Sequence, residues 1–125
     1  MTEIYNSRTF CLYEDIDQIK SRGLAKGGSL ENAIVVAENK ILNEDGLRNR
    51  HEFVDHKILD CLGDLMLLGH RVFGRIKTSQ GGHQLTNTLL REFCSNKLNW
   101  EFTNLEKKDK NHKDSRYSRP IAVNA

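Results

Sequence analysis

The feature that most constrains the fold is a long amphipathic helix, which the sequence predicts over residues 50–68. Its apolar residues recur at the three- and four-residue spacings that place side chains on one face of a helix. These residues are Phe53, Val54, Ile58, Cys61, Leu62 and Leu65. Gly69 follows directly and supplies a position at which the helix can end. Such a helix is stable when its apolar face packs against another layer of the fold.

The remaining elements alternate between helix and strand along the chain. We expect, in order, a helix at 14–22, a strand at 33–36, a turn at 43–46, the long helix, a strand at 71–79, a helix at 83–96 and a strand at 98–103. This order predicts an α+β fold of two layers, with helices packed on one face of a sheet. Two or three strands make a narrow sheet for two amphipathic helices, so part of the apolar face needs strands that this chain does not contain.

Charge separates the body of the chain from a tail. The 125 residues carry a net charge of +2, and six Lys/Arg against three Asp/Glu lie between Glu106 and Arg119. We expect residues 1–105 to form one domain and residues 106–125 to form a polar, disordered tail. The rest of the chain has a net charge of −1 and lacks basic residues interleaved with aromatics, which argues against nucleic acid as a partner.

Cysteine usage and hydropathy indicate a cytoplasmic protein without a membrane anchor. The cysteines Cys11, Cys61 and Cys94 are scattered and form no CxxC pair, so we expect no disulfide framework. A reducing compartment fits this pattern. Residues 1–7 are polar and acidic, unlike the apolar core of a signal peptide. The longest strongly apolar run, Leu65–Leu68, is too short to cross a bilayer.

Two polar residues of the long helix have the spacing of metal ligands. His56 and Asp60 are four positions apart and so project from one face, with Lys57 beside them and Asp64 one turn further along. A neutral imidazole and a carboxylate are both good zinc ligands. The same spacing also occurs in surface His–Asp pairs that contribute about 0.2–0.5 kcal/mol. Spacing alone leaves both interpretations open, and zinc needs a third protein ligand.

His83 and Thr9 are further residues that could take part in chemistry. His83 opens the second helix after Gly81 and Gly82, which would let the backbone approach a reacting centre and hold the imidazole over it. A solvated histidine at the start of a helix is the commoner case. Thr9 can likewise be a strand residue without a functional role.

These segments follow one another in a series along the chain. The series consists of Arg8-Thr9-Phe10, Ser21-Arg22-Gly23-Leu24, residues 27–36, residues 42–48, Glu52-Phe53-Val54, residues 56–60, Gly63-Asp64-Leu65 and Gly82-His83. It resembles the UDP-3-O-acyl-N-acetylglucosamine deacetylase family, zinc enzymes of lipid A biosynthesis. The resemblance covers Arg8 to Phe102 and is most specific from Leu42 to Leu65. It implies that the chain corresponds to part of the family's second domain, with its βαβ insert.

The resemblance implies residues that bind the metal and the substrate. His56 and Asp60 match two of the family's three Zn²⁺ ligands, and Lys57 matches a lysine that contacts the UDP-linked substrate. The insert contains an apolar passage for the acyl chain of the substrate. The positions that match this passage are Phe10, Ile16, Ala25, Gly28 and Val35.

The resemblance also implies three residues that act in the reaction. His83 matches a histidine that stabilises the oxyanion and protonates the leaving amine. Asp64 matches the carboxylate that orients this histidine. Thr9 matches a threonine that helps to hold the tetrahedral intermediate.

Two groups of the family's active site have no counterpart in the matching region. The third zinc ligand and the general base belong to the first domain, so we expect the isolated chain to be inactive and a separate polypeptide to supply them. Gln80 and Gly81 replace a Lys-Ser pair, which removes a positive charge expected near the nucleotide phosphates. Two other interpretations remain: a non-catalytic remnant, and an interaction module that binds nucleic acid or an anionic membrane surface through its basic tail.

Overall fold

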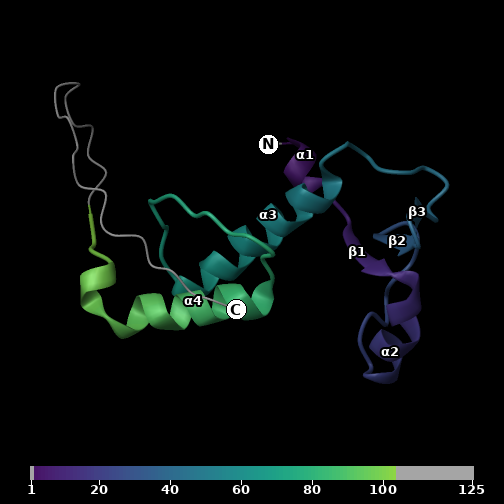
Figure 1. Ribbon diagram of the computed structural model, residues 1–125. Helices are drawn as coiled ribbons and strands as arrows, with labels where there is room; N and C mark the ends of the chain where they lie inside the picture. The colour runs from purple at the N-terminus through teal and green to yellow at the C-terminus, as the bar shows by residue number, and fades with distance from the viewer. Residues whose placement is uncertain (1, 104–125) are drawn as a thin grey trace. The chain divides into compact units, whose positions relative to one another are not determined.

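The computed structural model describes residues 2–103 and divides the chain into two compact units, Met1–Gly63 and Asp64–Ala125. Each unit is described by itself. Figure 1 labels the helices and strands in chain order. Within the described residues, no helix is both long enough and apolar enough to cross a membrane.

The first unit contains a β-α-β motif and a short third strand. A single helical turn, α1 (Thr2–Tyr5), precedes β1 (Thr9–Leu12), and a 3₁₀ turn then leads into α2 (Ile16–Ser21). The chain returns as β2 (Ala33–Ala37), which pairs parallel to β1 with Thr9 opposite Ala33, and continues into β3 (Lys40–Ile41), which pairs antiparallel to β2 (Figure 1). The predicted helix at 14–22 and strand at 33–36 are both confirmed.

Local chemistry explains where these elements begin and end. Gly23 adopts a left-handed φ of 72° and closes α2 through its N–H, which donates to the Lys20 carbonyl at 2.9 Å. The β-branched β2 supplies Ile34, with no exposed surface, and Val35, 8% exposed. Asn43 is buried at the predicted turn, where its side chain accepts from Val35 N–H at 2.9 Å and donates to the Ala33 carbonyl at 2.8 Å.

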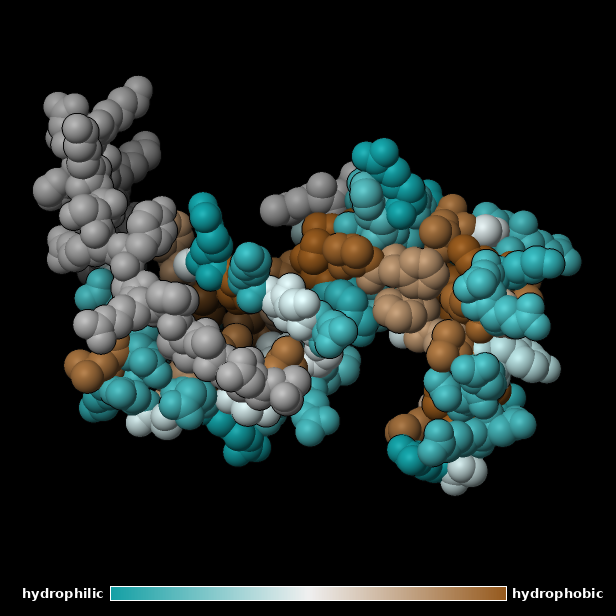
Figure 2. All heavy atoms as spheres, in the orientation of Figure 1, coloured by the Kyte–Doolittle hydropathy of each residue, from teal (hydrophilic) through white to brown (hydrophobic). Residues whose placement is uncertain are grey.

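The long helix forms as predicted, but much of its apolar face is exposed. α3 spans Glu52–Leu65, continues as a 3₁₀ turn over Met66–Leu68 and ends at Gly69, whose φ is 70°. Three residues of its predicted apolar face, Val54, Ile58 and Leu62, are 59%, 40% and 50% exposed. Figure 2 shows apolar side chains at the surface over α3. This exposure agrees with the expectation that part of the apolar face needs strands that this chain does not contain.

The second unit contains one long helix and no strand among its described residues. α4 spans His83–Ser95, close to the predicted 83–96, and buries Leu90 to 7% exposure. The strand predicted at 71–79 is wrong, because these residues are irregular and exposed throughout. The strand predicted at 98–103 is also wrong, since Lys97–Asn99 forms a 3₁₀ turn. A strand needs a neighbour that accepts and donates its ladder hydrogen bonds, and neither segment pairs with one in the described residues.

The α+β class is confirmed, and the sheet has the two or three strands expected, but β1 and β3 form it with β2 in place of the segments predicted at 71–79 and 98–103. The described strands form a single three-stranded mixed sheet of order β1-β2-β3, and all of them precede α3. The predicted tail at 106–125 lies outside the described residues.

Candidate functional site

α3 brings His56 and Asp60 together, as the four-residue spacing predicts. Nε2 of His56 lies 3.3 Å from Oδ1 of Asp60, and both side chains are 15% exposed. Two ligand atoms held about 2.0–2.1 Å from a tetrahedral zinc ion lie roughly 3.3 Å apart. The pair is therefore already spaced as two zinc ligands would be.

The atoms around the pair suit a metal site. Nδ1 of His56 lies 3.4 Å from the carbonyl oxygen of Ser7, and a metal-ligating histidine commonly donates its other ring N–H to such a group. Lys57 Nζ donates to the second carboxylate oxygen of Asp60 at 2.7 Å and lies 5.3 Å from the centre of the Phe10 ring. The Lys57 ammonium thus stands next to the carboxylate without taking the oxygen that faces His56.

The ligand set is incomplete within the part of the chain that the structure describes. No group of three or more His, Cys, Asp or Glu side chains in residues 2–103 is arranged to hold a metal ion. A catalytic zinc site uses three protein ligands and keeps one position open. His56 and Asp60 fit two of those positions, and residues 2–103 present no third ligand beside them.

The second unit contains the other ionisable pair expected from the sequence. His83 is the first residue of α4, and its Nδ1 lies 2.9 and 3.0 Å from the two carboxylate oxygens of Asp64. The imidazole is 69% exposed, whereas the Asp64 side chain is 17% exposed. A half-buried carboxylate that bonds one ring nitrogen fixes the orientation of an exposed imidazole, which is the arrangement that general acids use.

β1 places Thr9 and Phe10 in the same unit as the metal pair. Thr9 is the exposed first residue of β1. The Phe10 ring packs edge-on against Phe53 at 4.9 Å between centroids and against the His56 ring at 6.3 Å. Phe10 therefore lies beside His56, which fits its expected place in the substrate passage.

The other expected passage residues occupy separate parts of the β-α-β motif. Ile16 is half-buried at the start of α2, and Val35 is buried in β2. Ala25 and Gly28 meet in the turn between them, where Gly28 N–H donates to the Ala25 carbonyl at 2.9 Å. A Cβ added at Gly28 would lie 3.2 Å from that carbonyl oxygen, so a larger side chain would crowd the turn. The structure brings these two positions together and leaves Ile16 and Val35 on their own elements.

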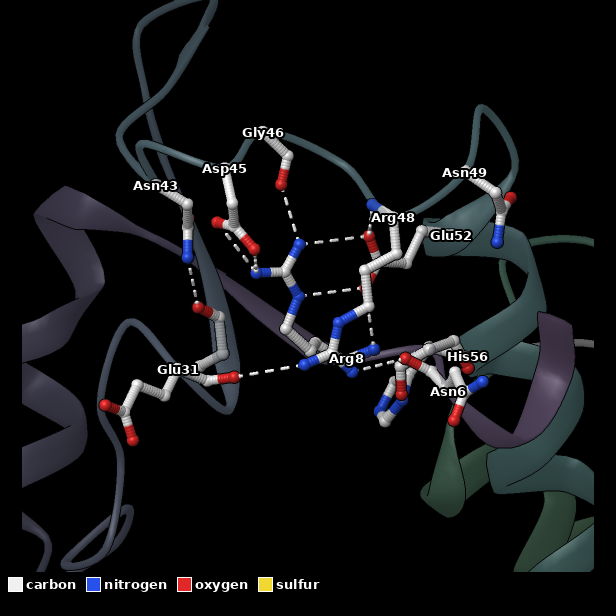
Figure 3. A network of polar contacts seen from close by, with 12 residues as sticks. Asn6, Arg8, Glu31, Asn43, Asp45, Gly46, Arg48, Asn49, Glu52 and His56 are labelled. Atoms are coloured by element: carbon white, nitrogen blue, oxygen red, sulfur yellow. Dashed lines mark hydrogen bonds and ion pairs between the residues drawn. The ribbon is translucent and has the colours of Figure 1, made fainter.

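One feature of the first unit was missed from the sequence. A buried pair, Arg8 and Glu52, is the centre of a polar network that we call the Arg8 network, to which Asp45, Gly46 and Arg48 also belong (Figure 3). The side chain of Arg8 is 2% exposed and that of Glu52 is fully buried, with Nε and Oε1 2.9 Å apart. Arg8 also donates to Asp45 at 3.0 Å and to the Gly46 carbonyl at 2.7 Å. No local sequence pattern marks this network, because Arg8 and Glu52 are 44 positions apart.

The network shifts the ionisation of both partners. Burial by itself raises the pKa of Glu52, but hydrogen bonds from Arg8 and from the Arg48 N–H, together with the charge of Arg8, outweigh it and lower the pKa to about 2. The hydrogen bond to Glu52 raises the pKa of Arg8 above its ordinary value, against the effect of burial. Both groups are therefore charged across the physiological pH range.

Comparison with known proteins relates this geometry to a family. Residues 1–95 match the family model of UDP-3-O-acyl N-acetylglycosamine deacetylase. The chain belongs to this family. It is 47% identical over 108 residues to a UDP-3-O-acyl-N-acetylglucosamine deacetylase from Mannheimia succiniciproducens, and 50% identical over 104 residues to one from Hahella chejuensis. A protein of the same name from Cellvibrio japonicus is 46% identical over 121 residues.

The alignments cover most of this chain but a minor part of each relative. They include 86%, 83% and 97% of the chain, against 35%, 34% and 39% of the Mannheimia, Hahella and Cellvibrio proteins. The chain thus spans little more than a third of the length of the curated family members that it matches.

Proposed function

We propose that this chain supplies the carboxy-terminal part of the active site of a cytoplasmic zinc-dependent deacetylase. The reaction is removal of the N-acetyl group from UDP-3-O-acyl-N-acetylglucosamine in lipid A biosynthesis. Residues 1–105 correspond in this proposal to part of the enzyme's second domain, in which the β-α-β motif is the insert. The observation that carries the proposal is the His56–Asp60 pair, whose ligand atoms lie 3.3 Å apart.

Zinc and substrate meet at α3 in this proposal. His56 and Asp60 hold the ion, which would supply Lewis acidity toward water and toward the amide carbonyl. Lys57 is held against Asp60 at 2.7 Å and contacts the substrate from the edge of the pair. The acyl chain follows the apolar residues of the β-α-β motif, which are Phe10, Ile16, Ala25, Gly28 and Val35.

His83, Asp64 and Thr9 act on the reacting amide. Asp64 holds Nδ1 of His83, so that Nε2 is the nitrogen that protonates the leaving amine and stabilises the developing oxyanion. The hydroxyl of Thr9, exposed at the start of β1, provides a further hydrogen bond to the oxyanion.

The isolated chain is inactive in this proposal, because the resemblance places the third zinc ligand and the general base in the family's first domain. A separate polypeptide that corresponds to the family's first domain supplies both. The exposed apolar residues of α3, Val54, Ile58 and Leu62, support this part of the proposal, since a stable helix face of this kind is normally covered.

The test is deacetylation of UDP-3-O-acyl-N-acetylglucosamine with zinc, by the chain alone and mixed with a family first-domain polypeptide. We expect turnover only in the mixture, and its loss in His56→Ala and Asp60→Ala. His51→Ala is the matched control, because His51 is exposed and lies five residues before His56, outside α3. Silence in the mixture would favour an inactive remnant, and turnover by the chain alone would contradict the account of the missing groups.

A further inference from the structure

A single peptide group lies between the Arg8 network and the proposed zinc ligand. The N–H of Arg8 donates to Oε1 of Glu52 at 3.0 Å. The carbonyl of Ser7, which belongs to the same peptide group, lies 3.4 Å from Nδ1 of His56. A trans peptide points its N–H and C=O in opposite directions, and Glu52 and His56 are one turn apart on α3. The peptide therefore joins the two side chains.

The Arg8 network fixes this peptide from several sides. Glu52 accepts from the backbone N–H of Arg8 and from its side chain, with Nε at 2.9 Å and Nη2 at 3.2 Å. The Arg48 N–H donates to the second Glu52 oxygen at 2.6 Å. Because both charges of the pair are buried, removing Arg8 would leave the Glu52 carboxylate without its cation, so the arrangement resists displacement.

We propose that the Arg8–Glu52 pair is a positioning device for His56. By holding the Ser7–Arg8 peptide, it keeps the Ser7 carbonyl against Nδ1–H and leaves Nε2 directed at Asp60 for the metal. At 3.4 Å the Nδ1 contact is at the long end for a hydrogen bond, so its alignment depends on how firmly the peptide is held. That the metal is zinc rests on the proposed function. The contact between the His56 ring and the Ser7 carbonyl does not depend on it.

The same pair acts on the start of β1. Thr9 follows Arg8 directly, so the bonds that fix the Arg8 backbone also fix the point from which the Thr9 hydroxyl extends. In the proposed site, Arg8 and Glu52 are neither metal ligands nor substrate contacts. They act through the Ser7–Arg8 peptide and the backbone of Thr9.

The test reads the ring protons of His56 in the full chain. In a ¹H–¹⁵N spectrum of the imidazole rings, an Nδ1–H that is held by a carbonyl oxygen gives a signal that exchanges slowly with water. The His56 signals are assigned by their absence in His56→Ala. We expect a slowly exchanging Nδ1–H in the wild type and in Arg48→Ala, whose side chain does not contact Glu52. In Glu52→Gln we expect exchange at least about ten times faster, since outer-sphere substitutions commonly have effects of 10–100-fold.

Three outcomes decide the inference. A Nδ1–H that exchanges freely in the wild type overturns it, and so does equal protection in a folded Glu52→Gln. If Glu52→Gln loses its helical circular dichroism, Arg8→Lys replaces it, because lysine keeps the charge and loses the Nε contact. Titration with zinc then separates the two proposals. A wild-type chain that shows the protected Nδ1–H, but binds zinc neither alone nor with the first-domain polypeptide, contradicts the proposed function and leaves the positioning role standing.

Discussion

The two units differ in how their segments find partners. In Met1–Gly63, β1 pairs with β2, Asn43 ties the turn to the sheet, and the Arg8 network joins β1 to α3. In the described part of Asp64–Ala125, residues 71–80 are exposed throughout and Leu90 is the buried apolar residue. The segment of β2 and the segment 71–79 both have the apolar pattern of a strand. Only β2 forms one, which teaches that such a pattern becomes a strand only where the chain supplies a neighbouring strand.

The largest expected effect tests the buried ion pair between Arg8 and Glu52 in the first unit. Arg8→Ala leaves the buried Glu52 carboxylate without its cation, and breaking a buried ion pair in this way costs about 3–5 kcal/mol. We expect this loss in the free energy of opening of the first unit, measured by amide hydrogen exchange in β1 and β2.

Arg48→Ala is the matched control for Arg8→Ala. The Arg48 side chain is exposed, and its contact to the Asn6 carbonyl lies at the surface, so we expect less than about 0.5 kcal/mol. If Arg8→Ala and Arg48→Ala lowered the free energy of opening equally, burial of the Arg8 charge would not be what stabilises the first unit.

Acid should weaken the first unit selectively. The folded pKa of Glu52 is about 2, below its ordinary value of 4.5, so its contribution to stability is fully present above pH 4.5 and is lost as the pH falls toward 2. The shift corresponds to a contribution on the order of 3 kcal/mol. Hydrogen exchange of β1 and β2 across this window measures it. Glu52→Gln should flatten the dependence, and an unchanged slope would contradict the assignment.

A smaller effect is expected in the second unit. Leu90 is 7% exposed but lines a shallow hollow with Leu67 and Leu68, with a volume of about 190 Å³. Leu90→Ala should cost about 2 kcal/mol, the low end for a buried leucine, because one side lacks tight packing. Fluorescence of Trp100, the single tryptophan, reports the loss on urea unfolding. Leu98→Ala is the control, since Leu98 is 90% exposed.

The longer helices and β2 were predictable because their signals are local, whereas β1 and β3 were not predicted from the residues and the β-α-β motif was implied only by the resemblance. Periodicity with Gly69 as a stop gave the long helix, and the β-branched run 33–36 gave β2. The strands at 71–79 and 98–103 were not predictable in the same way, because pairing depends on neighbours that the described residues lack. Exposure of Ile58 and Leu62 has the same cause, since periodicity tells which face is apolar but not what covers it.

The candidate site was predictable as far as spacing and resemblance reach. The i,i+4 spacing gave the His56–Asp60 pair, and the resemblance paired His83 with Asp64, which lie in contact 19 residues apart. The Arg8–Glu52 pair was missed because its members are 44 positions apart and no local pattern links them. Burial of both charges becomes visible only when the fold is known.

The smallest expected effect tests whether residues 71–79 of the second unit stay exposed when the first-domain polypeptide is bound. Phe73 is 82% exposed, so Phe73→Ser should change the stability of the chain by less than about 0.5 kcal/mol in the Trp100 unfolding measurement. If the 71–79 segment gains a neighbouring strand from the first-domain polypeptide, the same substitution should weaken association with that polypeptide by about tenfold, because a large aromatic would then be buried. Isothermal titration of the two polypeptides measures this. An unchanged affinity would mean that residues 71–79 stay uncovered in the complex, and that the exposure of this segment belongs to the family fold itself.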